Sequence, residues 1–393
     1  MPDQNKRLSI LFCASNHWEH PAQVGSHHLA RALTQAGYRV AFVGDPISPW
    51  HLLIGNDMGN RLTSYWRGGA WHLEGRLWSY TPMTLLPPAR YPLFNAPQVL
   101  KSWHRLAWPS PAAMLARHGF KNFAAIYVDS LRQARWWRGL PYGKCLLRLS
   151  DNLAGFGGWN NALQNSLSEL AGHVDMMAYT SPTLKPQVDD LRPRHSFYLP
   201  NGVAAAMFAS PAPKPAEYAQ INKPIAVYVG AMEQWFDYVL LNQLTALADW
   251  LDFVLIGPPD KARARLEPRS NLHILGTRPH RLLPGYLQHA RLGIIPFAAQ
   301  AFPELVSHIN PLKLLEYMAA GLPVASADWL YLRQSGLPVT LCRNLDDWLA
   351  VFRQCLERDN HSSQYQETAR QYDWELSAAK LLLEMGLPER GEL

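Results

Sequence analysis

Residues 309–328, INPLKLLEYMAAGLPVASAD, decide the fold class because they combine a helix with caps at both ends and a short apolar strand. Asn310 suits the N-cap and Pro311 the first helical position, while Gly321 and Pro323 suit the helix end. The pattern predicts a helix over about 311–320 and then a buried strand at LPVASAD. A strand that follows a helix in this way is typical of a parallel α/β sheet.

The alternation of strand and helix continues on both sides of this stretch. Apolar runs that end in glycine or a polar residue stand at LSILFCA (8–14), YRVAFVGD (38–45), FAAIYVDS (123–130), GKCLLRLSDN (143–152), DMMAYTS (175–181), IAVYVGAM (225–232), DFVLIGPP (252–259) and RLGIIPF (291–297). Segments of helical character separate them, and Gly37 stands where a helix C-cap belongs. We therefore predict an α/β protein with two Rossmann-like, doubly wound domains that face each other across a cleft.

A Pro-rich segment, SPAPKPAEYAQINKP at 210–224, interrupts the alternation and marks a domain boundary. We predict a first domain over 1–203, a second over 204–365, and a C-terminal amphipathic helix over 366–393 that packs back on the first domain. Residues 50–120 are rich in Trp, Pro and Gly, and there we expect long loops and short helices.

Composition excludes several classes of protein. Of the 393 residues, 48% are hydrophobic and 17% charged, as in a soluble globular protein, and no fixed-period repeat is present. No apolar stretch reaches the ~20 residues that a membrane span needs. The four cysteines, Cys13, Cys145, Cys342 and Cys355, are too scattered for a zinc site or a disulfide framework, so we expect a reducing cytoplasm.

The net charge of +6 is unevenly distributed along the chain. Residues 1–200 carry 20 Lys and Arg against 11 Asp and Glu, whereas residues 201–393 carry 17 against 20. Within 61–148 the count is 13 basic to 2 acidic, and seven tryptophans lie among them: Trp66, Trp71, Trp78, Trp103, Trp108, Trp136 and Trp137. This combination suits an anionic membrane surface. An ordinary basic surface over core tryptophans explains it equally well, and no nucleic-acid recognition motif accompanies it.

Several short motifs occur in an order and spacing that resemble a known family. They are LPNGV, YVGAM with WFD, LIGP, LGTRPHRLLPGYLQHARLGIIPF, NPLKLLEYMAAGLPV and YDWE. Together they resemble the GT-B glycosyltransferases, most closely the bacterial polysaccharide-assembly enzymes of the xanthan glucuronosyltransferase type and the teichuronic-acid-type transferases. The resemblance is strongest over 225–328, weaker over 8–45 and 144–203, and absent over 50–120. It implies an acceptor-binding first domain and a nucleotide-sugar-binding second domain.

The helix at 311–320 has the chemistry of a diphosphate and ribose site. Its free N–H groups favour an anion, and Lys313 in the first turn adds a full positive charge. Lys313 and Glu316 are three residues apart and so share one helix face. The resemblance implies that Lys313 lies by the diphosphate and that Glu316 binds the ribose hydroxyls, although a solvated ion pair would give the same spacing.

The catalytic carboxylate is expected elsewhere. Many retaining enzymes of this fold have a second Glu eight residues before Glu316, where this chain has His308, and this departure favours an inverting mechanism, although Glu304 is close. An inverting transferase needs a general base. Asp151 follows a predicted buried strand and matches the family's proposed base; an Asx turn is the alternative explanation. Asp129, at an equivalent strand end, is the second candidate.

The resemblance also implies weaker assignments. Residues expected near the donor are Gly230, Met232, Thr277, Arg278, Phe297, His308 and Leu312. Residues of the first βα loop expected to face the donor sugar and the acceptor are Asn16, His17 and Gly25. Met232 and Phe297 could instead be core residues, Arg278 a surface charge, and any of His17, His20, His27 and His28 a structural histidine.

The expected function is transfer of a sugar from a UDP-sugar, such as UDP-glucuronate or a UDP-hexose, to a lipid-linked oligosaccharide in exopolysaccharide biosynthesis. The enzyme would be inverting and independent of metal and cofactor, bind no nucleic acid, and act at the inner face of the membrane. The alternatives are a retaining enzyme that uses a GDP- or other NDP-sugar, a UDP-sugar epimerase, a non-catalytic interaction protein and a nucleic-acid-binding protein.

Overall fold

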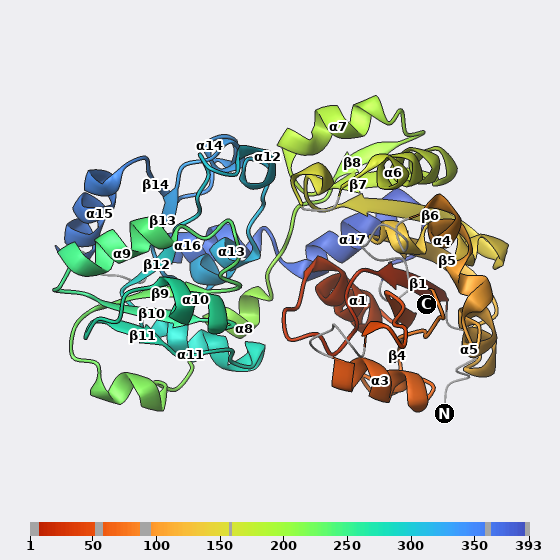
Figure 1. Ribbon diagram of the computed structural model, residues 1–393, viewed down its shortest axis with the longest axis horizontal. Helices are drawn as coiled ribbons and strands as arrows, with labels where there is room; N and C mark the ends of the chain where they lie inside the picture. Colours follow the sequence, from red (N-terminus) through yellow and green to blue (C-terminus); the bar gives the residue numbers. More distant parts are fainter. Residues whose placement is uncertain (1–7, 52–57, 87–95, 157–158, 358–362, 390–393) are drawn as a thin grey trace. The chain divides into compact units, whose positions relative to one another are not determined.

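The computed structural model describes residues 8–51, 58–86, 96–156, 159–357 and 363–389, which belong to two compact units (Figure 1). The first unit comprises residues 1–199 with 377–393, and the second comprises residues 200–376. The sequence predicts divisions after residues 203 and 365, so the first lies four residues from the observed one and the second eleven. Each unit is an α/β structure whose sheet is parallel apart from one edge pair in the first unit, and the predicted fold class is confirmed.

The first unit has an eight-stranded sheet in the order β3-β4-β2-β1-β5-β6-β7-β8. Its strands are β1 (Ser9–Ala14), β2 (Arg39–Gly44), β3 (Ala70–His72), β4 (Leu77–Tyr80), β5 (Phe123–Val128), β6 (Tyr142–Leu149), β7 (Met176–Tyr179) and β8 (Ser196–Tyr198). All neighbouring pairs are parallel except β3 with β4. The carboxyl ends of β1, β2, β5 and β6 therefore lie at one edge, where side chains from distant parts of the sequence meet.

Helices cover both faces of this sheet. They are α1 (Gly25–Gln35), α3 (Met58–Trp66), α4 (Pro97–Ser102), α5 (Pro111–Arg117), α6 (Asn161–His173), α7 (Lys185–Asp190) and α17 (Trp374–Met385), with short turns η2 (Trp103–Leu106), η3 (Leu131–Gln133), η4 (Trp136–Gly139), η5 (Leu153–Gly155) and η6 (Pro182–Leu184). Alternate residues of a strand point to opposite faces. Leu11 of β1 packs in the cluster that contains Leu167 of α6, whereas Phe12 stacks on Phe42, which contacts His27 of α1.

Two strands lie where loops were expected. β3 and β4 extend the sheet within 50–120, so the prediction of only loops and short helices there was wrong. Trp78 of β4 is fully buried and pairs with Ala41 of β2, while the β3–β4 turn places Leu73 and Glu74 in the left-handed region. Such short strands hold no apolar run long enough to reveal them, and their position depends on pairing with β2.

The second unit has a six-stranded parallel sheet in the order β11-β10-β9-β12-β13-β14. Its strands are β9 (Ile225–Val229), β10 (Asp252–Ile256), β11 (Leu272–Ile274), β12 (Leu292–Ile295), β13 (Val324–Ala327) and β14 (Thr340–Cys342). Its helices are α8 (Ala205–Ala209), α9 (Tyr238–Leu247), α10 (Asp260–Arg265), α11 (Leu283–Gln288), α12 (Pro303–Val306), α13 (Leu312–Ala319), α14 (Leu330–Ser335), α15 (Leu345–Glu357) and α16 (Ser363–Arg370), with turns η7 (Ala216–Gln220) and η8 (His280–Leu282).

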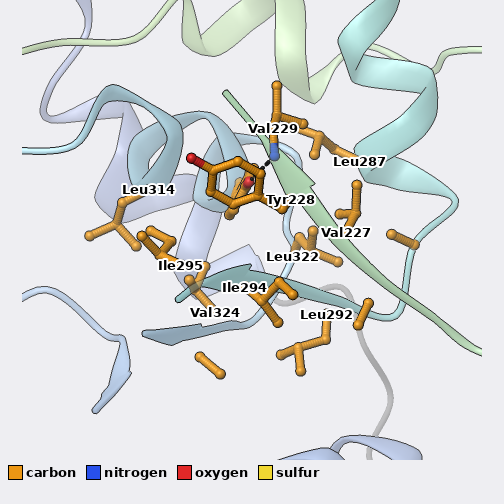
Figure 2. Close-up of a cluster of buried hydrophobic side chains, with 14 of the residues drawn as sticks. Val227, Tyr228, Val229, Leu287, Leu292, Ile294, Ile295, Leu314, Leu322 and Val324 are labelled. Carbon is orange, nitrogen blue, oxygen red and sulfur yellow. Dashed lines mark hydrogen bonds between the residues drawn. The ribbon is translucent and has the colours of Figure 1, made fainter. Parts of the chain in front are cut away.

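The core of the second unit forms around β9 and β12. Figure 2 shows a cluster of buried apolar side chains that includes Val227 and Val229 of β9, Ile294 of β12 and Leu314 of α13. The Val229 N–H donates to the hydroxyl of Tyr317 of α13 over 2.7 Å. The buried tyrosine thus joins α13 to the central strand. This contact fixes α13 against the sheet, since the peptide N–H and the phenol satisfy each other in an apolar surrounding.

The helix quoted at the start forms as predicted at its end but not at its beginning. Gly321 has φ +77°, its N–H donates to Met318 over 2.8 Å, and the Leu322 N–H donates to Tyr317 over 2.9 Å, which is a Schellman motif. The predicted N-cap, Asn310, is wrong. Pro311 occupies the N-cap with extended geometry and no side-chain cap, since its ψ of 118° lies outside the helical region and the helix therefore starts one residue later.

The close packing of α13 on β12 gives a first prediction. A Cβ at Gly293 would lie 2.4 Å from the Tyr317 ring, so Gly293→Ala forces two core elements apart and is expected to destabilise the protein by about 1–3 kcal/mol. Gly172→Ala is the control, because Gly172 lies in α6 and a Cβ there meets nothing within 4 Å. Urea unfolding measures both variants, and equal stability of the two would contradict the packing described here.

The last helix belongs mainly to the first unit. Residues Ala378, Leu381, Leu382 and Met385 of α17 are buried, with the spacing of one helix face. The Tyr38 hydroxyl donates to the Pro388 carbonyl over 2.6 Å, and His195 lies 2.7 Å from Glu384. The end of the chain therefore completes the first unit. In the described ranges, no helix has both the length and the apolar character that crossing a membrane requires.

Candidate functional site

Lys313 lies in the first turn of α13, beside the carboxyl end of β9. Its Nζ donates to the Tyr228 hydroxyl over 3.1 Å and lies 4.6 Å from the centre of the Tyr228 ring and 4.7 Å from that of Phe297. Burial lowers the pKa of Lys313 to about 7, and Glu316 opposes this shift. Removing the ammonium from water disfavours its charge, and the two ring faces and Glu316 compensate in part.

The turn after β9 leaves space for the end of the Lys313 side chain. Gly230 has φ +140°, and a Cβ there would lie 2.8 Å from the Lys313 Nζ. The Tyr228 hydroxyl donates to the Ala231 carbonyl over 2.7 Å while it accepts from Lys313. Met232, the next residue, is buried, and its carbonyl accepts a hydrogen bond from Tyr238. The structure thus brings Gly230, Phe297 and Lys313 together but directs Met232 into the core of the second unit.

Glu316 does not pair with Lys313. Its carboxylate lies 2.7 Å from Nε2 of His280, at the start of η8, and only 13% of the Glu316 side chain is exposed. The His280 ring makes an edge contact with Phe208 of α8. The histidine therefore orients the carboxylate from the loop after β11, and the solvated ion pair considered for Lys313 and Glu316 is not what the structure shows.

The other residues predicted near the donor occupy several environments. Arg278 donates to Glu217 over 2.8 Å, to the Tyr286 hydroxyl over 3.1 Å and to the Leu275 carbonyl over 2.6 Å, so it braces the loop after β11. Thr277 precedes it, and its carbonyl also accepts from Arg278.

Phe297 is buried and stacks on Trp329 as well as facing Lys313. His308 lies between α12 and α13, and Leu312 is the first residue of α13; both are partly buried.

Both carboxylate candidates lie at the carboxyl edge of the first sheet. Asp129 follows β5 and Asp151 follows β6, and each interacts electrostatically with Arg148 of β6. Burial raises the pKa of each carboxyl to about 6, against the opposing effect of Arg148. The Ser15 N–H donates to Asp129 over 2.8 Å, which further favours the charged form. Two carboxyls that titrate close to neutrality beside a buried cation are candidates for acid and base chemistry.

Gly25 makes room for this arginine. A Cβ at Gly25, the first residue of α1, would lie 2.5 Å from Nη1 of Arg148, which itself donates to the Ser150 hydroxyl over 3.2 Å. Of the residues predicted in the first βα loop, Gly25 thus lies with the carboxylates. Burial lowers the pKa of His17 to about 4, with Arg61 and His20 as further causes, and its carbonyl accepts from His27 over 3.0 Å. Asn16 is partly buried next to it.

The turn after β6 is held by a neighbour of Asp151. The Asn152 side chain accepts from the Ala154 N–H over 3.2 Å and caps η5. The Asx turn considered for Asp151 is therefore made by Asn152. Among the described residues, no group of three or more His, Cys, Asp or Glu side chains could hold a metal ion.

Sequence reasoning missed three residues of these two sites. Arg148 is a charged residue inside the apolar run CLLRLS, which was a usable signal because a buried arginine needs partners. Tyr228 and His280 gave no such signal. Tyr228 lies in an apolar strand where a tyrosine is ordinary, and His280 is separated from its partner Glu316 by 36 residues of sequence.

Two families match the chain. Residues 12–180 match the family described as the N-terminal domain of glucuronosyltransferase GumK, and residues 223–347 match the family described as glycosyl transferases group 1. The first match runs through 50–120, where the quoted motifs carried no resemblance. Between them the two families cover most of both units.

Solved structures share the fold at low sequence identity. Sucrose-phosphate synthase from Thermosynechococcus elongatus superposes with a TM-score of 0.69 at 15% identity, covering 96% of this chain and 98% of that one. Anabaena HepE, solved in complex with UDP and glucose, gives 0.64 at 14% identity, covering 97% and 100%. The lipopolysaccharide outer core galactosyltransferase WaaB gives 0.57 at 12% identity, covering 96% and 99%. No curated protein matches the sequence.

Proposed function

Because the chain is a glycosyltransferase of the GT-B fold, related to the GumK-type enzymes, we propose that it transfers a sugar from a UDP-sugar to a lipid-linked oligosaccharide. Transfer would proceed with inversion and without a metal ion, in exopolysaccharide biosynthesis at the inner face of the membrane. The observation that carries the proposal is the Lys313 amine held at the carboxyl end of β9, with Glu316 on the same helix face.

The donor chemistry follows from these groups. A lysine amine can donate to a diphosphate, and a carboxylate can accept from the two ribose hydroxyls. Lys313 would also stabilise the charge that builds on the leaving diphosphate, which is the work a metal ion does in other transferases. HepE was solved with UDP-glucose, and the first matching family is described as a glucuronosyltransferase, so UDP-glucose and UDP-glucuronate are the first donors to test.

Asp151 is proposed as the base that takes the acceptor proton, with Asp129 as the second candidate. A pKa of about 6 leaves either carboxyl mostly ionised near neutrality and able to accept a proton. The anomeric configuration of the product tests the proposed inversion. NMR of the newly formed product measures this configuration and so distinguishes inversion from retention.

Nucleotide-sugar binding tests the donor assignment. UDP-glucose, UDP-glucuronate, GDP-mannose and UDP are added to the protein, and melting is followed with each. A ligand that binds only the folded protein stabilises it by about 2.7 kcal/mol at a hundred times its dissociation constant. We expect UDP compounds to raise the melting temperature and GDP-mannose to have no effect. A rise in melting temperature with GDP-mannose alone would overturn the choice of nucleotide, and an isomerised UDP-sugar formed without acceptor would indicate an epimerase.

The membrane part of the proposal is supported by a surface of exposed apolar and basic residues, which we call the Trp surface: Trp66, Arg67, Leu85, Arg105, Leu106 and Trp108. Trp66 is 76% and Trp108 82% exposed. The Tyr65 hydroxyl donates to the Trp108 carbonyl, and the Leu85 N–H to the Leu106 carbonyl, so these segments are adjacent. Of the other tryptophans in 61–148, Trp78, Trp103, Trp136 and Trp137 are core residues and Trp71 is 41% exposed.

Exposed tryptophans beside arginines favour a lipid interface. The double variant Trp66→Ser with Trp108→Ser is expected to weaken binding to vesicles of phosphatidylglycerol and phosphatidylcholine by roughly tenfold or more. Leu247→Ser, at a 50% exposed position of α9, is the matched control and should bind normally. Co-sedimentation measures both variants, and normal binding by the double variant would exclude the Trp surface as the contact.

A further inference from the structure

The two carboxylate oxygens of Glu316 differ in their surroundings. Oε1 lies 2.7 Å from Nε2 of His280, and since a carboxylate can only accept hydrogen bonds, Nε2 carries the hydrogen and donates it. Among the described residues, none donates to the other oxygen, Oε2, and 13% of the side chain is exposed. Glu316 therefore keeps one oxygen, with two lone pairs, available to a ligand.

His280 is itself restrained by its surroundings. Its ring makes an edge contact with Phe208 of α8, and it begins the turn η8. Two residues earlier in the same loop, Arg278 donates to Glu217 over 2.8 Å. A donor that is held in place in this way keeps the flexible Glu316 side chain in one conformation.

This order is present before any nucleotide arrives. Restricting a glutamate side chain costs conformational entropy, and in the native protein this loss occurs on folding rather than on binding. A glutamate without the histidine could rotate toward solvent and accept from water instead. The hydrogen bond from His280 therefore prepares Glu316 for hydroxyl groups that lie at one place.

We propose that His280 is a positioning residue through which the donor site selects ribonucleotides over 2′-deoxyribonucleotides. The inference rests on the proposed function, since it concerns the nucleotide of the same donor. With Oε1 occupied by the imidazole, the two lone pairs of Oε2 match the two neighbouring hydroxyls of a ribose. A 2′-deoxyribose lacks one of these hydroxyls and leaves part of a mostly buried carboxylate without a donor. The site would thus prefer UDP-sugars to sugars carried on thymidine diphosphate, whose pentose is 2′-deoxyribose.

Calorimetry with UDP and 2′-deoxy-UDP as probes measures this selectivity, because the two molecules differ in one hydroxyl. We expect the native protein to bind UDP about 10- to 100-fold more tightly, the range for a hydrogen bond to a charged group. His280→Phe keeps an aromatic ring beside Phe208 but donates no hydrogen bond to Glu316. It is expected to reduce the selectivity at least about threefold, through weaker binding of UDP with little change for 2′-deoxy-UDP.

His280→Gln is the matched conservative variant. Its amide can place an N–H close to the position of Nε2, so most of the selectivity should be retained. Glu316→Ala removes the carboxylate and should abolish the selectivity. Adding His280→Phe to Glu316→Ala should then change UDP affinity no further, because a residue that acts through Glu316 has nothing left to position.

Melting curves of the unliganded variants establish that each is folded. If His280→Phe does not fold, His280→Asn takes its place, since the asparagine amide is too short to reach Oε1 of Glu316. The same ratio of UDP to 2′-deoxy-UDP affinity is measured for it.

The outcomes are distinct. A native protein without selectivity, unchanged selectivity in His280→Phe, or equal loss of affinity for both nucleotides would overturn the inference while UDP remains the proposed donor nucleotide. If the native protein does not bind UDP at all, the proposed function itself fails. Selectivity that falls in His280→Phe, is retained in His280→Gln and is independent of residue 280 in the Glu316→Ala background supports the inference, because a merely structural histidine would affect both nucleotides alike.

Discussion

Asp151→Asn is expected to lower the turnover number by about 10²- to 10⁴-fold and, at the same time, to stabilise the protein. Turnover falls because the proposed base is removed, and asparagine cannot take the proton from the acceptor hydroxyl. Stability rises because the native carboxylate, whose charge is disfavoured by burial in the folded protein, is replaced by a neutral amide. UDP binding should be unchanged because Asp151 belongs to the first unit and the proposed donor residues Lys313 and Glu316 to the second.

The direction of the pH dependence follows from the pKa of Asp151. Its folded value, about 6, is above its ordinary value, so the folded state binds more protons between these two values. The carboxyl therefore does not lower the free energy of unfolding at low pH. It lowers the free energy of unfolding increasingly as the pH rises from about 4 to 6, and by a constant amount above pH 6. Asp151→Asn should be more stable than the native protein by about 1–3 kcal/mol near pH 7 and equally stable near pH 4. Urea unfolding at the two pH values checks this.

Asn152→Ala is the matched control for a purely structural effect at the same turn. It removes the cap of η5 and is expected to cost about 1 kcal/mol with little change in turnover. If Asp151→Asn instead loses stability and keeps its turnover, Asp151 is a structural residue. If Asp129→Asn alone loses turnover, the base is Asp129, which is the second candidate.

Lys313→Met is expected to weaken UDP binding by about 10- to 100-fold and to lower the turnover number by about 10²- to 10³-fold. Methionine keeps much of the packing of the lysine stem but donates no hydrogen bond. The effect on turnover should exceed the effect on binding because charge on the leaving diphosphate is greatest in the transition state. Calorimetry and steady-state kinetics measure the two effects separately.

The same variant should not destabilise the free protein. Burial lowers the pKa of Lys313 from its ordinary value to about 7, so below pH 7 the buried charged amine lowers the free energy of unfolding by its full amount. This destabilisation declines as the pH rises from 7 towards 10.5, because the folded protein has lost the proton there and the unfolded chain loses it near 10.5. Lys223→Met is the control, since Lys223 is exposed and donates to the Asp249 carbonyl. Equal UDP affinity of Lys313→Met and Lys223→Met would exclude Lys313 from the donor site.

The fold was predictable where a local pattern and the tertiary structure agree. The C-terminal end of α13 and the apolar strands depend on neighbours within a few residues, and such signals are visible in a sequence. β3 and β4 depend instead on pairing with β2. Features set by distant partners left no local pattern.

The site residues divide in the same way. Lys313 and Gly230 could be predicted because a helix start and a turn after a strand place them at the sheet edge. The contacts that govern their chemistry could not, since Tyr228 meets Lys313 across 85 residues of sequence and His280 meets Glu316 across 36. The catalytic assignment of Asp151 stays a prediction, and the measurements above address it.

The return of the chain to its first unit has a consequence for synthesis. Residues 377–393 belong with residues 1–199, and α17 fills part of that unit with the buried stripe around Leu381. A ribosome that adds 5–20 residues per second needs roughly 10–35 s between residue 199 and residue 377. During this interval the second unit can fold while the first still exposes the apolar surface that α17 will cover. The first unit therefore finishes folding last, although its strands are made first.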